Sequence, residues 1–123
     1  MSPRRRIPAR GDLYAVTLNP VTGNELQGEQ RPVLVISPEA FNAHNPALCV
    51  PVTQGGNHAR VQGFAVTLLG TGLRTQGAVI ASQVRALDLA ARHASYLETA
   101  PDFVVQEVLA RLNAILDDSV PAS

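Results

Sequence analysis

The chain has 123 residues, of which 46% are hydrophobic and 16% are charged, and its formal net charge is zero. This length suffices for one hydrophobic core, and the composition excludes an intrinsically disordered chain. A single cysteine, Cys49, excludes a disulfide framework within one chain and is expected in the core. No apolar run reaches the roughly 20 residues that span a bilayer, so we expect a cytoplasmic protein without a membrane partner.

The charges are distributed unevenly along the chain. Residues 1–10 carry four arginines, residues 31–97 carry five arginines against two acids, and residues 98–123 carry five acids against one arginine. The central region is therefore net positive and the last segment net negative. Such a division allows a basic face to meet phosphate groups while the acidic segment points elsewhere.

The first half of the chain predicts three strands, over residues 13–18, 33–36 and 47–53, because each is an apolar run rich in strand-forming residues. Residues 21–30 are mostly polar with two glycines and predict a long connecting loop. The second strand is expected to be central and buried, with Pro32 at its first residue, where a missing N–H is tolerated. Ser37 is expected to cap one helical turn that ends at Asn42.

The second half predicts strands over residues 63–69 and 77–82, the latter with an optional extension to residue 87, separated by a glycine turn. Five short strands indicate a small barrel or a strongly bent sheet. Apolar residues spaced three and four apart from Phe103 to Leu116 predict an amphipathic helix, with Thr99 as its cap. We expect this helix to pack on its own barrel, with docking of a partner as an additional role. Phe41 and Phe103 are expected in the core.

Several classes of chemistry lack their motifs. No Gly-x-Ser-x-Gly elbow occurs, which argues against an acyl-transfer triad. The three histidines, His44, His58 and His93, do not have metal-ligand spacing, and the glycine-rich segments lack the lysine and the setting of a nucleotide-binding loop. We therefore expect neither a metal nor another cofactor.

A loop carboxylate, Glu25, a cation at a strand entrance, Arg31, and a hydroxyl at a strand exit, Thr53, remain as candidates. RNA carries its own nucleophile, the 2′-hydroxyl, so a base, a cation and a proton donor would suffice for its cleavage. The alternative is structural: a solvated glutamate, a surface ion pair and a strand-ending threonine. Residue types alone favour this alternative.

Ordered blocks of the sequence resemble the MazF/PemK toxin family, and its ChpB and Kid/PemK branch most closely. The resemblance covers about residues 10–117 with family-like spacing. The blocks that carry it are Arg10-Gly11-Asp12-Leu13-Tyr14, Leu18-Asn19-Pro20, residues 23–38, Pro51-Val52-Thr53, residues 54–60, Gly63-Phe64-Ala65-Val66 and residues 82–92.

This resemblance implies a mainly β fold with α, a small SH3-like barrel (CcdB/Kid/MazF-like) closed by a C-terminal helix. The expected domain covers residues 10–118, between tails at 1–9 and 119–123. The resemblance further implies a homodimer with an RNA groove across its interface, a MazE/PemI-like antitoxin, and DNA contact as part of an antitoxin–toxin operator complex. The implied activity is sequence-specific, ribosome-independent and metal-independent cleavage of single-stranded mRNA to 2′,3′-cyclic phosphate and 5′-hydroxyl ends, which inhibits translation and growth.

The resemblance also assigns residue roles. Arg31 matches the family arginine that stabilises the cleaved phosphate and is a candidate proton donor to the leaving oxygen. Thr53 matches the threonine that contacts that phosphate. Glu25 matches the glutamate of the preceding loop and is the candidate general base.

The sequence departs from the family pattern in one place. Many members have an acid where this chain has Ser82, and a serine cannot act as a carboxylate base at neutral pH. Gln83, Asn57, Phe64 and Ser82 are candidate RNA contacts, each with a structural alternative. A non-catalytic toxin that binds DNA gyrase, as the related CcdB does, is the competing hypothesis.

Overall fold

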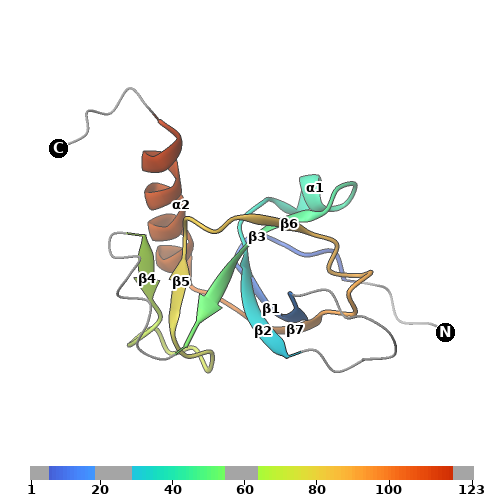
Figure 1. Ribbon diagram of the computed structural model, residues 1–123, viewed down its shortest axis with the longest axis horizontal. Coiled ribbons are helices and arrows are strands. Elements are labelled where there is room, and N and C mark those ends of the chain that lie inside the picture. Colours follow the sequence, from blue (N-terminus) through green and yellow to red (C-terminus); the bar gives the residue numbers. More distant parts are fainter. Residues whose placement is uncertain (1–5, 19–28, 55–63, 118–123) are drawn as a thin grey trace.

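The computed structural model describes residues 6–18, 29–54 and 64–117, which form a bent antiparallel sheet and two helices (Figure 1). Their order is β1 (Asp12–Thr17), β2 (Gln30–Val35), α1 (Glu39–Asn42), β3 (Ala47–Thr53), β4 (Ala65–Thr67), β5 (Ala78–Ile80), β6 (Arg85–Leu87), β7 (Ser95–Thr99) and α2 (Asp102–Leu116). Figure 1 shows α2, in red, beside β4 and β5 at one end of the sheet. Neither helix of the described residues is long and apolar enough to cross a membrane.

The strands pair in the order β4-β5-β3-β2-β1-β7, and β6 pairs with a separate stretch of β3. Within the described residues the end strands β4 and β7 do not pair, so the sheet is bent but not closed. A side chain links the two ends instead. The Glu98 carboxylate of β7 accepts hydrogen bonds from the N–H groups of Arg74 and Thr75, ahead of β5, at 3.1 and 2.7 Å. The predicted mainly β fold with a C-terminal helix is confirmed, as an open barrel.

Apolar side chains pack on both faces of the sheet. One cluster lies between the sheet and α2, where Val104, Val105 and Val108 are at most 3% exposed. The second cluster consists of Tyr14, Val16, Leu18, Val33, Val35, Ala47, Cys49, Leu87 and Leu89. We call the face that carries the second cluster the far face, because it points away from α2. The packing of α2 on its own sheet and the burial of Cys49, 1% exposed, are confirmed.

A proline explains why the predicted fifth strand is two strands. β3 pairs with β6 through its first three residues and with β5 through its last two, and Pro51 lies in the gap between them. The Leu48 carbonyl accepts the Ile36 N–H of the segment after β2 at 2.9 Å. The backbone N–H and C=O groups of successive strand residues point alternately to the neighbouring strands on the two sides. Leu48 faces β2, so the odd-numbered residues of β3 point their N–H positions towards β5 and β6. Pro51 has no N–H to donate there, and the pairing breaks.

β2 begins at Gln30, so the prediction that Pro32 starts this strand is wrong. Pairing with β1 runs from Gln30 to Leu34, whereas pairing with β3 begins only at Val33. The Val35 carbonyl accepts the Gly11 N–H ahead of β1, so the even-numbered residues of β2 point their N–H positions towards β3. Pro32 therefore faces β3 before their ladder begins, and it costs no hydrogen bond.

Both predicted helix caps are wrong. Thr99 is the last residue of β7, a strand that the sequence did not predict, and its hydroxyl donates to Asp12 Oδ1 at 3.1 Å. The Ser37 hydroxyl donates to the side chain of Asn42, and no side chain caps α1 or α2. These polar groups join neighbouring segments, which sequence spacing alone does not reveal.

The two phenylalanines expected in the core are exposed instead. Phe41 on α1 is 39% exposed and Phe103 on α2 is 64% exposed. Phe103 lies beside the buried Val104 and Val105 but on the outer side of the first helical turn. The apolar stripe of α2 was therefore predicted one residue too wide at its start.

Candidate active site

Arg31 and Thr53 lie on neighbouring strands at the same end of the sheet. The pairing of β2 with β3 ends with Val33 opposite Pro51, and Arg31 and Thr53 are each two residues beyond this last pair. Side chains alternate between the two faces, so both residues share the far face with Val33. We call Arg31 and Thr53 the β2–β3 pair.

The side chain of Arg31 is exposed. No residue of the described segments makes a hydrogen bond or an ion pair with its guanidinium group. The backbone is held in place, since Arg31 pairs with Val16 of β1. A guanidinium group on a fixed strand, with its donors available, can hold a phosphate group at two oxygens.

Thr53 is fixed by the next strand. It pairs with Ala78 of β5, and Gly77 packs against its carbonyl group. Gly77 has a φ of +116°, and a Cβ atom there would lie 2.2 Å from the Thr53 carbonyl oxygen. Only glycine permits this approach. The backbone of the half-buried Thr53 is therefore held in a defined position against β5.

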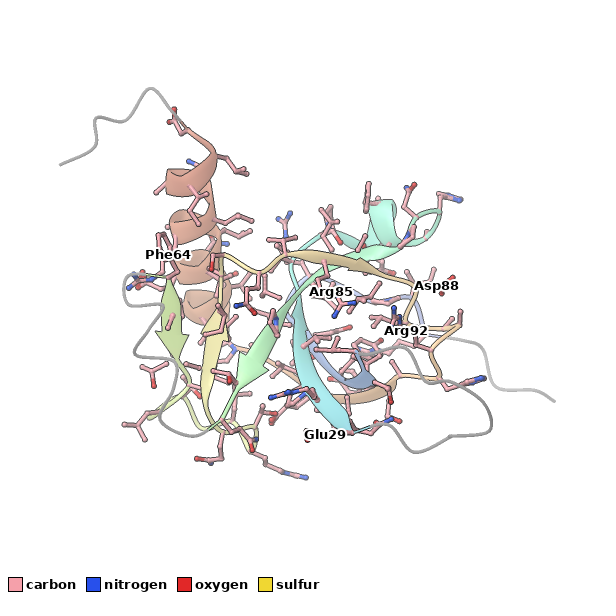
Figure 2. The ribbon with its side chains drawn as sticks, in the orientation of Figure 1. Glu29, Phe64, Arg85, Asp88 and Arg92 are labelled. Atoms are coloured by element: carbon pink, nitrogen blue, oxygen red, sulfur yellow. The ribbon has the colours of Figure 1, made fainter. Side chains whose placement is uncertain are left out.

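Three other candidates lie at the opposite end of β5. The Phe64 carbonyl accepts the N–H of Ala81 at 2.8 Å, and Ser82 and Gln83 follow Ala81 in the turn after β5. All three side chains are exposed, that of Phe64 by 40%. Figure 2 shows Phe64 beside α2. The structure thus separates these residues from the β2–β3 pair.

Glu25 and Asn57 lie outside the described residues, so their roles stay predictions. The same holds for His58, whereas His44 and His93 are exposed. Over residues 6–18, 29–54 and 64–117, no three His, Cys, Asp or Glu side chains come together as possible metal ligands.

Two arginines that the sequence did not single out meet at the end of β1. Arg85 on β6 donates from Nη2 to the Leu18 carbonyl at 3.2 Å. Arg92, in the turn after β6, donates from Nη1 to the Thr17 carbonyl at 2.7 Å and to the Leu18 carbonyl at 3.3 Å. Figure 2 shows the two side chains near each other below β6. The sequence signals for this arrangement were the arginine excess of residues 31–97 and the place of both arginines in the block of residues 82–92.

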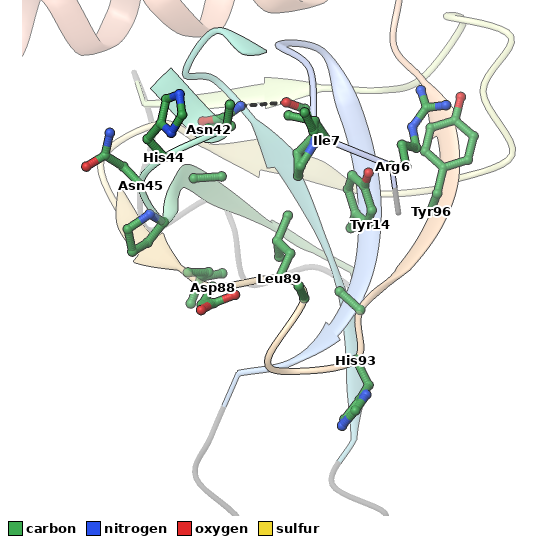
Figure 3. Close-up of a pocket in the computed structure, with 17 residues that line it drawn as sticks. Arg6, Ile7, Tyr14, Asn42, His44, Asn45, Asp88, Leu89, His93 and Tyr96 are labelled. Carbon is green, nitrogen blue, oxygen red and sulfur yellow. Dashed lines mark hydrogen bonds between the residues drawn. The ribbon is translucent and has the colours of Figure 1, made fainter. Parts of the chain in front are cut away.

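A cavity of about 750 Å³ lies elsewhere on the molecule, between residues 6–8, the end of α1 and residues 87–96 (Figure 3). Arg6 stands at its rim, 3.9 Å from the centre of the Tyr96 ring. The Tyr14 hydroxyl is buried without a hydrogen-bond partner among the described residues, and burial raises the pKa of Tyr14. Neither Arg31 nor Thr53 lines this cavity, so it is separate from the β2–β3 pair.

Comparison with known proteins decides the family. Residues 9–116 match the PemK-like, MazF-like toxins of type II toxin-antitoxin systems. The chain belongs to this family. The endoribonuclease PemK of Escherichia coli is 48% identical over 108 residues, which cover 87% of this chain and 80% of that protein. The endoribonuclease toxin ChpB of Escherichia coli is 45% identical over 108 residues, with coverages of 88% and 93%.

Solved structures of the PemK/MazF family have the same fold. The MazE–MazF crystal structure (Form-II) from Deinococcus radiodurans matches with a TM-score of 0.78 and 35% identity, covering 91% of this chain and 97% of that chain. MazF alone (Form-I) from the same organism gives a TM-score of 0.76, with coverages of 91% and 98%. The family resemblance expected from the sequence is confirmed.

Proposed function

We propose that this protein is an endoribonuclease toxin that cuts single-stranded mRNA without a metal ion, leaving 2′,3′-cyclic phosphate and 5′-hydroxyl ends. The proposal is supported by the pairing of β2 with β3, two neighbouring strands whose alternation directs the side chains of Arg31 and Thr53 to the far face. Relatives named endoribonucleases, at 48% and 45% identity, support it. Cleavage at specific sequences, independent of the ribosome, would stop translation and growth.

In the proposed reaction the RNA 2′-hydroxyl loses its proton to a base and its oxygen attacks the adjacent phosphorus. A bond forms between phosphorus and the 2′-oxygen, and the bond to the 5′-oxygen breaks. Arg31 stabilises the charge that develops on the phosphate oxygens, and Thr53 donates a hydrogen bond to the same group. The leaving 5′-oxygen takes a proton, for which Arg31 is our candidate donor.

Glu25 is the proposed base. Ser82, where many relatives have an acid, lies after β5, at the opposite end of that strand from Ala78 and its partner Thr53. It carries no carboxylate, so the loop before Arg31 is the place in this chain from which a family base can come. Ser82, Gln83, Asn57 and Phe64 stay proposed RNA contacts.

The proposed assembly is a homodimer that a MazE/PemI-like antitoxin inhibits in the cytoplasm, where mRNA is found. Crystal structures named MazE–MazF, at 35% identity for Form-II, support an antitoxin partner. Binding of operator DNA together with the antitoxin completes the proposal.

The test is to incubate the purified protein with a long single-stranded RNA in excess EDTA and to map the cut ends. We expect discrete cuts with 5′-hydroxyl ends, and a cleavage rate at least about 100-fold lower for Arg31→Ala, the typical loss on removing one oxyanion donor. Arg10→Ala is the matched control, because within the described segments the Arg10 side chain hydrogen-bonds only to the Ile36 carbonyl, at 2.7 Å. Full-rate cutting by Arg31→Ala would contradict the proposal, and intact RNA with all proteins would favour a gyrase-binding toxin.

A further inference from the structure

Arg85 and Arg92 converge on one atom. Both donate to the carbonyl oxygen of Leu18, at 3.2 and 3.3 Å, so their guanidinium groups are close neighbours. They come from different elements, β6 and the turn that follows it, which brings together two positive charges that sequence spacing does not pair. We call them the arginine couple.

Nothing in the described residues neutralises the arginine couple. Each known partner is a neutral backbone carbonyl, and no carboxylate of these residues forms an ion pair with either side chain. The nearest acid in sequence, Asp88, accepts the Ala91 N–H through Oδ1 at 3.0 Å. Like charges held together repel each other, and an anion between them would remove this repulsion. Each guanidinium group retains N–H donors for such an anion.

The arginine couple lies on the same face as the β2–β3 pair. Arg85 shares the far face with Leu87, two residues further along β6. Arg31 pairs with Val16, and the carbonyl that the arginine couple holds lies two residues beyond Val16, about 7 Å along a strand. A strand of RNA with its phosphate on Arg31 can therefore reach the arginine couple within very few nucleotides.

We propose that Arg85 and Arg92 together bind one further phosphate group of the RNA, beside the phosphate that is cut. This inference rests on the proposed function, because it takes RNA as the ligand. Two arginine forks can surround one phosphate group, and backbone contacts of this kind fix the register of a nucleic acid without reading its bases. Arg85 and Arg92 are thus positioning residues for the substrate, and they do not take part in bond breaking.

The test measures binding of a fluorescein-labelled 2′-O-methyl RNA of mixed sequence, which has no 2′-hydroxyl and cannot be cut through one. The slope of log affinity against log salt concentration falls by about 0.7 for each single-strand phosphate contact that is lost. For Arg85→Gln/Arg92→Gln we expect the salt slope to fall by about 0.7 and the affinity to be at least about 10-fold lower. Arg85→Lys/Arg92→Lys keeps both charges and should keep the slope. Arg10→Gln is the matched control, with an arginine that also binds a carbonyl, and should change neither value.

An unchanged slope in the folded glutamine variant would overturn the proposal, and so would loss of antitoxin binding alone, which would make the arginine couple a site for a protein carboxylate. If the glutamine variant does not fold, a fall of about 0.7 in the salt slope of the lysine variant, which keeps both charges, overturns the proposal equally. The readout is independent of cleavage. A protein that cuts no RNA but shows the slope change would contradict the proposed function and would leave only the binding of an RNA phosphate by Arg85 and Arg92 supported.

Discussion

Arg31 and Thr53 offer a phosphate group two different interactions, a delocalised charge and a single hydroxyl donor. Hydrogen bonds to charged groups contribute about 1.5–3 kcal/mol, which corresponds to roughly 10- to 100-fold in rate. We expect Thr53→Val to slow cleavage within this range. In the proposed mechanism both residues act on one phosphate, so the losses of Thr53→Val and Arg31→Ala should not add in the double variant. Rates of the four proteins on one RNA measure this, and strict additivity would show that they act on different groups.

Cys49 belongs to the second apolar cluster, and burial raises the pKa of its thiol to about 12. The reactive thiolate is therefore almost absent at neutral pH. We expect a chromogenic disulfide reagent at pH 8 to leave Cys49 unmodified in the native protein and to modify it fully in urea. Rapid labelling of the native protein would mean that this cluster opens readily.

Among the elements, the junction of β3 and β5 depends on Gly77. Gly72→Ala adds only backbone strain at a φ of +85°, with no atom within 4 Å of the new Cβ, whereas Gly77→Ala also meets the Thr53 carbonyl. We expect the free energy of unfolding to fall by about 1 kcal/mol for Gly72→Ala and by about 3 kcal/mol for Gly77→Ala. Cleavage should fall only for Gly77→Ala, because Thr53 shifts. Equal effects of the two variants on both measurements would contradict this account.

The link between the two ends of the sheet depends on the charge of Glu98. Burial alone would raise its pKa, but hydrogen bonds from the Thr75 hydroxyl, at 2.7 Å, and from the Thr75 and Arg74 N–H groups outweigh burial and lower it below the ordinary 4.5. A lowered folded-state pKa means that the carboxylate stabilises the fold above the unfolded-state pKa. This contribution is lost as the pH falls from about 4.5 through the folded-state pKa.

Urea unfolding at pH 7 and pH 3 tests this link. We expect Glu98→Gln to lose less stability between the two pH values than the unchanged protein, since its side chain does not titrate. Glu107→Gln is the control, because Glu107 pairs only across an exposed helix turn with Arg111, at 3.6 Å. An identical pH dependence in all three proteins would contradict a stabilising Glu98 carboxylate.

The sequence predicted those elements whose pattern is local. β3 and α2 have the predicted bounds, because a continuous apolar run and a helical period each signal one structure. β7 was missed, because most of its side chains are exposed and no alternation marks it. Its place is set by pairing with β1, far away in the chain. The break at Pro51 likewise depends on which strands lie beside it.

Part of the candidate site could likewise be predicted from the sequence, and part could not. Family resemblance pointed to Arg31 and Thr53, and the pairing of two predicted strands explains why both lie at the same end of the sheet. The arginine couple was not predictable, because its contacts join residues 67 to 75 positions apart. Such contacts follow from the bend of the whole sheet.

For the whole molecule, the two faces of the sheet have different roles. α2 covers one face with Val104, Val105 and Val108. The far face carries the β2–β3 pair, and the arginine couple at the end of β1. Arg31 and Arg85 of the central region thus lie on the face without the acidic helix, as the uneven charge along the sequence suggested.

In the proposed mechanism the RNA supplies the nucleophile, its 2′-hydroxyl, and the protein supplies the base, the charge stabilisation and the proton donor. The direct measurement compares two RNA strands of the mapped cut sequence in EDTA, one with a 2′-hydroxyl and one with a 2′-hydrogen at the cut nucleotide. We predict that both bind the protein with similar affinity and that only the 2′-hydroxyl strand is cut. Cleavage of the 2′-hydrogen strand would show that another nucleophile attacks the phosphate and would contradict the mechanism.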